Sequence, residues 1–163
     1  MGSETEPSAN VDPSHRISAV IPTLGREKVL VETIGAVLAL PQPAEEVLVV
    51  DQTPEHEPAT EAALRSWRDD GRIRWLRLEK ASIPYAMNVG LKNAAFAIVL
   101  FLDDDIVPDE GLVAAHRRAH QQPGVTAVTG MVLQPGETPT PRDESAARGE
   151  GLWRDLGFPF RST

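Results

Sequence analysis

The sequence predicts an α/β protein of three layers (α/β/α), in which helices cover both faces of a mostly parallel sheet. Short runs of β-branched and large apolar residues alternate along the chain with segments of helical periodicity. Two of the runs, residues 47–50 and 97–102, end directly in acidic residues. Buried parallel strands read as continuous apolar runs, and parallel neighbours need a crossover helix between them. The alternation therefore predicts a doubly wound sheet with acidic residues at its carboxyl edge.

The expected elements follow in a regular order. Strands are expected at residues 17–21, 47–50, 73–78, 97–102 and 125–133. Helices are expected at about residues 27–40, 57–70, 84–95 and 108–120. In the third helix, Met87, Leu91 and Ala94 are expected to face inward. The strand at 97–102 is expected to be fully buried, because its residues are apolar without interruption.

Composition limits the classes of function. A chain of 163 residues is long enough for one domain with a core and too short for two ordinary ones. The formal net charge of −8 argues against a nucleic-acid partner, and the lack of cysteine excludes disulfides and thiolate chemistry. Because we find neither a transmembrane segment nor a signal-peptide pattern, we expect a cytoplasmic protein, free or peripheral at the inner membrane face.

Three regions are expected along the chain. Residues 1–15 are polar and aperiodic and predict a disordered leader, whereas residues 16–133 contain all the expected elements. Residues 134–151 are rich in Pro, Gly, Glu, Ser and Thr and predict a flexible loop. The chain then ends with an apolar cluster of Trp153, Phe158 and Phe160, which needs a surface to pack on. The cluster either folds back over the sheet or begins a further subdomain, and we favour the second.

Three carboxylates, Asp103, Asp104 and Asp105, follow the fourth expected strand. In an extended chain Asp103 and Asp105 project to one side and Asp104 to the other. Like charges this close disfavour each other's ionisation unless a cation lies beside them, and carboxylate oxygens suit Mg²⁺ or Mn²⁺. The cluster therefore favours a divalent metal site for a phosphorylated ligand, with a solvated acidic turn as the alternative.

The loop after the first strand, residues 22–26, argues against two common nucleotide-binding folds. It contains a single glycine, Gly25, whereas a dinucleotide-binding domain has a glycine-rich first turn. The sequence also lacks the P-loop pattern. A nucleotide bound at this edge without either loop needs a metal to neutralise its phosphates, and the acidic cluster can hold one.

Four segments have the order and spacing found in family-2 glycosyltransferases, and the sequence resembles that family over about residues 17–133. The segments are 21–26 (Ile-Pro-Thr-Leu-Gly-Arg), 49–52 (Val-Val-Asp-Gln), 83–90 (Ile-Pro-Tyr-Ala-Met-Asn-Val-Gly) and 101–105 (Phe-Leu-Asp-Asp-Asp). The resemblance implies a Rossmann-like GT-A fold that binds a nucleotide-diphosphate sugar, with a UDP-sugar favoured. It also implies transfer of the sugar, with inversion, to a hydroxyl of an unknown glycan, lipid or small-molecule acceptor.

The resemblance implies roles for residues on the nucleoside side of the site. Pro22, Thr23 and Arg26 match the loop near the nucleotide base. Asp51 matches the acid that accepts a hydrogen bond from the base, and Asn88 matches an Asn beside the donor.

The resemblance also assigns the acidic cluster to the family's Asp-x-Asp motif. Asp103 then lies near the ribose, Asp104 is one of the residues that bind the nucleotide-sugar, and Asp105, with Asp103, binds Mg²⁺ or Mn²⁺ on the diphosphate. Two positions depart from the family pattern, because Met87 replaces the usual Arg and Ser82 a common Gly.

No catalytic residue is assigned, because the resemblance implies a general base downstream of Thr163. The sequence is therefore expected to be a donor-binding half, with the C-terminal acceptor half missing. Two alternatives stay open, a nucleotidyltransferase-like enzyme and a non-catalytic, degenerate donor-binding module.

Overall fold

The computed structural model describes residues 11–133, 136 and 137. The chain divides into two units, Met1–Thr129 and Gly130–Thr163, and all the elements below belong to the first. The aromatic cluster expected at Trp153, Phe158 and Phe160, and nearly all of the loop expected at 134–151, lie outside the described residues.

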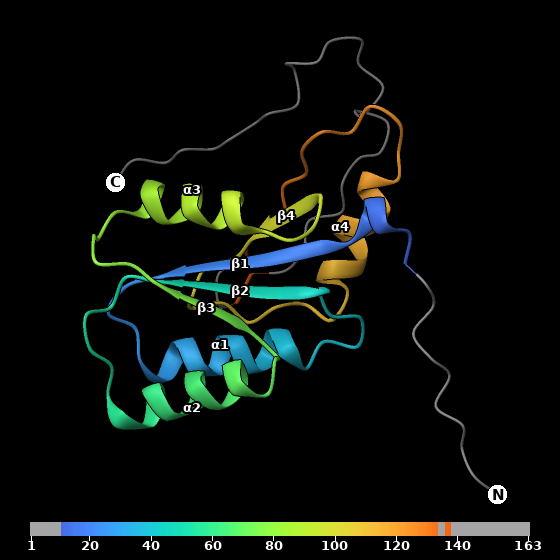
Figure 1. Ribbon diagram of the computed structural model, residues 1–163. Coiled ribbons are helices and arrows are strands. Elements are labelled where there is room, and N and C mark those ends of the chain that lie inside the picture. Colours follow the sequence, from blue (N-terminus) through green and yellow to red (C-terminus); the bar gives the residue numbers. More distant parts are fainter. Residues whose placement is uncertain (1–10, 134–135, 138–163) are drawn as a thin grey trace, which may run out of the picture. The chain divides into compact units, whose positions relative to one another are not determined.

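Four parallel strands form one sheet in the order β3-β2-β1-β4 (Figure 1). They are β1 (Ile17–Thr23), β2 (Glu46–Asp51), β3 (Arg74–Arg77) and β4 (Ile98–Phe101). In the register of the sheet, Val20 of β1 lies opposite Leu48 of β2 and Phe101 of β4. The central strands β1 and β2 are buried along almost their whole length, which accounts for their continuous apolar sequences.

Helices cover both faces of this sheet. They are α1 (Lys28–Leu38), α2 (Pro58–Asp69), α3 (Ile83–Asn93) and α4 (Leu112–His120). Figure 1 shows α3 on one face and α1 with α2 on the other, so the three-layer parallel α/β fold predicted from the sequence is confirmed.

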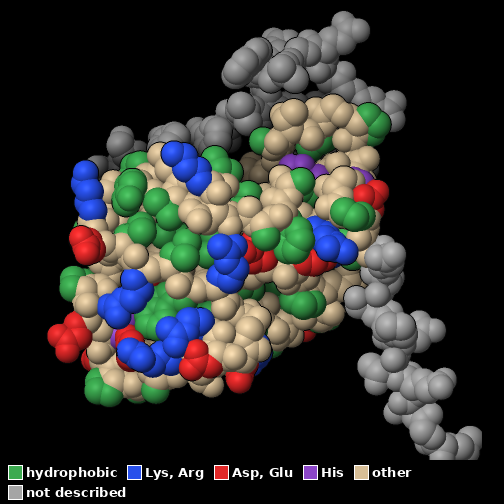
Figure 2. Space-filling view, viewed as in Figure 1, with side chains coloured by type: hydrophobic (Ala, Val, Ile, Leu, Met, Phe, Trp, Pro, Cys, Tyr) green, Lys and Arg blue, Asp and Glu red, His purple; other side chains and the backbone are tan. Residues whose placement is uncertain are grey.

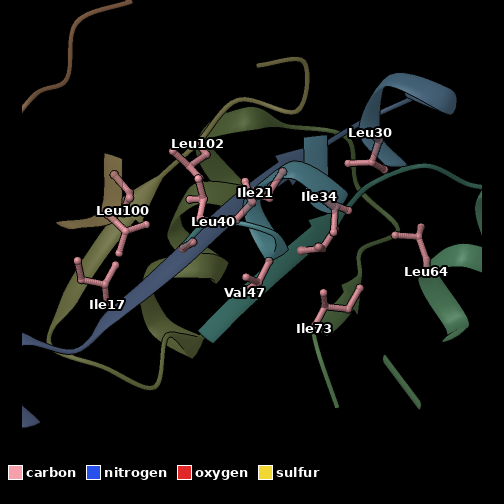
Figure 3. Close-up of a cluster of buried hydrophobic side chains, with 14 of the residues drawn as sticks. Ile17, Ile21, Leu30, Ile34, Leu40, Val47, Leu64, Ile73, Leu100 and Leu102 are labelled. Carbon is pink, nitrogen blue, oxygen red and sulfur yellow. The ribbon is translucent and has the colours of Figure 1, made fainter. Parts of the chain in front are cut away.

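Two apolar cores follow from the alternation of side chains along the strands. The larger core packs α1, α2 and α4 on one face, and Figure 3 labels among its residues Ile17, Ile21, Leu30, Ile34 and Leu64. The smaller core joins α3 to the opposite face through Ala86, Val20, Leu48 and Val50.

Two expectations about the strands were wrong. β4 is only half-buried at Val99 and Phe101, because it is the edge strand of the described sheet. The described residues 125–133 form no strand. Their apolar, β-branched residues favour a strand, but composition alone does not distinguish a strand from an irregular segment.

The described secondary structure begins within residues 1–15, which were expected to form a disordered leader. Residues 1–10 lie outside the described residues, whereas Pro13–His15 form a short 3₁₀ helix, η1. The Asp12 carboxylate caps it by accepting the Ser14 N–H at 2.9 Å. The carbonyl of His15 accepts a hydrogen bond from Arg117 of α4 at 3.3 Å, which ties this segment to the domain.

The inward face of α3 differs from the prediction. Met87 and Leu91 are 36% and 56% exposed, and Figure 2 shows hydrophobic side chains gathered over this helix. The buried positions are instead Ala86 and Gly90. A Cβ atom at Gly90 would lie 2.4 Å from the Val20 side chain, so α3 packs too closely on the sheet for a larger residue.

Gly90→Ala should therefore lower the free energy of unfolding by about 1–3 kcal/mol, because the added methyl overpacks against Val20. Gly35→Ala is the matched control, since the nearest atom to its Cβ is Trp67 at 4.0 Å. Alanine there should leave stability unchanged or raise it by up to about 1 kcal/mol. Denaturant unfolding of both variants checks this, and equal stabilities would contradict the close packing of α3.

Candidate functional site

The order of the strands identifies one position at the carboxyl edge as a ligand site. The chain reverses direction across the sheet between β1 and β4, and open α/β sheets bind ligands at such a point. Thr23 is the last residue of β1, and the acidic turn, Asp103–Asp105, follows β4 directly. Residues far apart in the sequence thus meet at the edge that the sequence predicted.

Thr23 and Arg26 hold the acidic turn by direct contacts. The Thr23 hydroxyl donates to Oδ2 of Asp104 at 2.6 Å, and Nη2 of Arg26 donates to Oδ2 of Asp105 at 3.1 Å. Nε of Arg26 also lies 3.5 Å from Oδ1 of Asp104. The predicted alternation of these acids was wrong, because β4 ends at Phe101 and the chain turns at 104–105, so two successive carboxylates face Arg26.

The acidic turn offers oxygen ligands but not a complete protein cage for a metal. Among the described residues, no three acidic or histidine side chains come together as metal ligands. Asp105 is 46% exposed, and Asp103 is exposed as well. Mg²⁺ is commonly held by one or two carboxylates together with substrate phosphates. The turn therefore fits a divalent cation that a phosphorylated ligand helps to bind.

Asp51 lies in a second cluster, in which its own side chain and that of His56 are completely buried, although the sequence suggested that Asp51 faces a ligand. Its Oδ1 accepts the Thr53 N–H at 2.8 Å. Its Oδ2 accepts the indole N–H of Trp75 at 3.0 Å and lies 2.9 Å from Nε2 of His56. With none of its side chain exposed, Asp51 has its hydrogen bonds inside the protein.

His56 joins Asp51 to Glu27 through the two nitrogens of its ring. Nε2 contacts Asp51, and Nδ1 lies 3.0 Å from Oε1 of Glu27. This geometry suits the imidazolium form of His56, in which both ring nitrogens donate, because ionised carboxylates only accept hydrogen bonds. Burial opposes this charge, but the hydrogen bonds and charges of Asp51 and Glu27 outweigh it and raise the pKa of His56 above its ordinary value.

The residues that follow Asp51 connect the neighbouring loops. The backbone N–H of Gln52 donates to the Thr23 carbonyl at 2.9 Å, and its side-chain oxygen accepts the N–H of Ser82 at the start of α3. The Thr53 hydroxyl accepts the Gly25 N–H at 2.9 Å. The exit of β2 therefore fixes the loop after β1 and the first turn of α3.

An open groove of about 520 Å³ runs along the ends of β2 and β3, within the size range of small-molecule sites. Its lining residues are Thr53, Pro54, Arg77, Leu78 and Glu79. Arg77 shapes its wall by donating to the carbonyls of Thr53 at 3.1 Å and Pro54 at 2.8 Å, and its guanidinium lies over the Trp75 ring.

The predicted site residues thus fall into groups. Thr23, Arg26 and two acids of the turn lie together, and Pro22 lies beside them in β1. Asp51 belongs to the buried cluster, and Asn88 is exposed on α3. The sequence analysis missed Glu27 and His56. The available signal was a histidine five residues after a strand-ending acid, in an otherwise polar loop.

Comparison with known proteins agrees with the fold and with the family that the sequence resembles. The sequence model of the family "Glycosyl transferase family 2" matches residues 18–159. The chain belongs to this family. Among the described residues, every helix is too short or too polar to cross a membrane.

A curated relative is the uncharacterized glycosyltransferase YfnE of Bacillus subtilis (strain 168), 33% identical over 87 residues. The match covers 53% of this chain and 22% of that protein. The chain thus spans about a fifth of the length of this relative.

Solved structures have the same fold. S. aureus TarS 1–349 in complex with UDP-GlcNAc is 23% identical, with a TM-score of 0.54 over 65% of this chain and 31% of that one. The mannosyltransferase PcManGT from Pyrobaculum calidifontis, in complex with GDP-Man and Mn²⁺, is 23% identical, with a TM-score of 0.54. That match covers 71% of this chain and 36% of PcManGT.

Asp51→Asn should destabilise the fold strongly, because it leaves the buried imidazolium without one of its two carboxylates. Breaking a buried charged pair costs about 3–5 kcal/mol. Asp103→Asn, at an exposed acid of the turn, should change the free energy of unfolding by no more than about 0.5 kcal/mol. Denaturant unfolding distinguishes the two, and a stable Asp51→Asn variant would contradict the structural role of this carboxylate.

Proposed function

We propose that this domain binds a nucleotide-diphosphate sugar and provides the donor site of a glycosyltransferase. The observation that carries the proposal is the meeting of Thr23, Arg26 and the acidic turn at the point where strand order reverses. Family membership supports sugar transfer. The UDP-GlcNAc and GDP-Man complexes of proteins with this fold support a nucleoside diphosphate as the carrier.

The nucleoside and the diphosphate of such a donor suit different parts of the carboxyl edge of the sheet. The groove beside Thr53 and Arg77 has room for the nucleoside, for which we favour uridine over guanosine. The diphosphate then extends toward the acidic turn, where Asp105 and Asp103 hold Mg²⁺ or Mn²⁺, Asp103 lies near the ribose and Asp104 contributes to binding of the nucleotide-sugar. Asn88 and Pro22 complete the surroundings of the donor, and Asp51 acts by fixing the loops that contact it.

The chemistry divides between the cation and the chain. A bound Mg²⁺ or Mn²⁺ stabilises negative charge on the departing nucleoside diphosphate. Thr23 orients Asp104 through its hydroxyl, and Arg26 neutralises the turn before the ligand arrives. We propose inversion at the anomeric carbon, with a general base that lies outside the residues assigned here.

Binding of the donor should be visible as a thermal shift. UDP or GDP with Mn²⁺ should raise the melting temperature of the wild type, because a ligand that binds only the folded state stabilises it. Asp105→Asn should abolish the shift, and Asp70→Asn, at an exposed acid that ends α2, should retain it.

The outcomes separate the parts of this proposal. If Asp105→Asn responds as the wild type does, the metal assignment is wrong. If the folded wild type responds to neither nucleotide, the donor site is wrong and a non-catalytic module is favoured. Release of pyrophosphate from a nucleoside triphosphate and a sugar phosphate would instead support a nucleotidyltransferase.

Arg26 should compete with a metal for the acidic turn when no nucleotide is present. Arg26→Gln should tighten the binding of Mn²⁺ alone by about tenfold, the size of one charge interaction at a half-exposed site. Arg26→Lys keeps the positive charge and should bind Mn²⁺ as weakly as the wild type. Calorimetric titration with Mn²⁺ measures all three, and equal affinities would rule out competition by Arg26.

A further inference from the structure

The ion cluster of Glu27, His56 and Asp51 adjoins the groups assigned to the donor, because Asp51 accepts the Thr53 N–H at 2.8 Å and Glu27 follows Arg26 in the chain. Its three members come from the start of α1, the loop before α2 and the end of β2. The side chains of His56 and Asp51 are completely buried, whereas that of Glu27 is 25% exposed. Burying a charge is costly unless it is paired and hydrogen-bonded, so the two buried members, His56 and Asp51, need all their contacts.

Glu27 shows what the cluster does to the donor loop, residues 23–27. Glu27 occupies the N-cap of α1, but its side chain makes no hydrogen bond to the first turn of that helix. Its carboxylate points instead to His56 and accepts the Glu57 N–H at 3.2 Å. The helix thus forgoes a capping interaction, and the loop is fastened to the end of β2 instead.

Glu27, which His56 holds in place, is the residue next to Arg26. On the other side of Arg26, Gly25 is held by the Thr53 hydroxyl at 2.9 Å. The residues that flank Arg26 are therefore both anchored to the segment that begins at Asp51, one directly and one through His56. This double anchor sets where the guanidinium and Thr23 meet the acidic turn.

We propose that His56 is a positioning residue for donor binding, which as an imidazolium ties Glu27 to Asp51 and so holds the donor loop against the end of β2. The inference rests on the proposed function, because it assigns His56 to the site for a nucleotide-diphosphate sugar. His56 acts through Glu27 and the loop, and it touches no ligand itself.

The charge of His56 gives this role a pH dependence. The groups that face the ring are Asp51 of β2, Glu27 before α1 and, at 6.3 Å between centroids, the indole of Trp75 on β3. Two cations lie over the Trp75 ring, Arg77 of β3 at 5.4 Å and Arg68 of α2 at 5.9 Å, and Arg77 also lies 3.8 Å from Glu61 of α2. The two carboxylates therefore dominate the surroundings of the ring and raise the pKa of His56.

The direction of the effect follows from the number of N–H groups. Below the ordinary histidine pKa of 6.5, both nitrogens donate and the link is complete. As the pH rises through the raised pKa, the neutral ring keeps one N–H and can donate to only one carboxylate. The donor loop then loses one of its two anchors, the one through His56, while the hydrogen bond from Gly25 to Thr53 remains, and donor affinity falls.

Calorimetric titration of UDP or GDP with Mn²⁺ from pH 6 to 9 tests this, at a temperature where circular dichroism shows every protein folded. Relative to His56→Gln, wild-type affinity should fall by about tenfold as the pH rises, the value of one charge-assisted hydrogen bond. His56→Gln should bind about tenfold more weakly at pH 6 and show a flatter profile. Titration of the nucleotide itself is common to all variants and cancels in the ratio of affinities.

Two further variants complete the test. Glu27→Gln removes the negative charge that pairs with His56, at the member of the cluster that is partly exposed. It should reproduce the weaker binding even if His56→Gln folds poorly. His116→Gln is the matched control, because His116 is also buried but lies on α4, where burial and His120 lower its pKa. It should keep the wild-type affinity and pH profile.

Two results would overturn the inference, and they can be told apart. If His56→Gln and Glu27→Gln lower the melting temperature but keep the wild-type affinity and profile, His56 has a structural role only. If the wild type binds neither nucleotide at any pH, the proposed function fails and this inference fails with it.

Discussion

The buried carboxylate of Asp51 is the constraint on which the carboxyl edge of this sheet depends. A charge removed from water must be paired and hydrogen-bonded, and Asp51 obtains its partners from three places in the sequence. Thr53 supplies a backbone N–H, Trp75 an indole N–H and His56 a charged imidazole. His56 in turn requires Glu27, so one buried charge fixes β3 and the segments that precede α1 and α2.

The acids of this edge therefore divide by their surroundings. Asp51 is completely buried and has its hydrogen bonds inside the protein, whereas Asp105 is half-exposed and shares one cation, Arg26. Asp51 therefore organises the loops, whereas Asp105 keeps oxygen lone pairs for a ligand. Because the loops are fixed by buried contacts, the exposed groups are ordered before a ligand binds, which reduces the entropic cost of binding.

The parts of the fold that the sequence predicted are those that one strand or helix determines alone. β1 and β2 are central and buried on both faces, and a continuous apolar run is sufficient to identify them. The expected strand at 125–133 was wrong because a short apolar run alone does not distinguish a strand from an irregular segment. The prediction that Met87 and Leu91 face inward was wrong, because close packing of α3 at Gly90 outweighed the larger apolar area of these two side chains.

The same reasoning explains what could be predicted of the site. Topology brings Thr23 to Asp104 across a separation of 81 residues, and a strand-ending acid is enough to predict which edge both occupy. The neutralising partner of each acid leaves no such local pattern, since Arg26 lies 79 residues from Asp105 and Glu27 lies 29 from His56. A sequence pattern therefore identifies acids at the edge of a sheet, but burial and the partner cation decide which of them is free to bind a ligand.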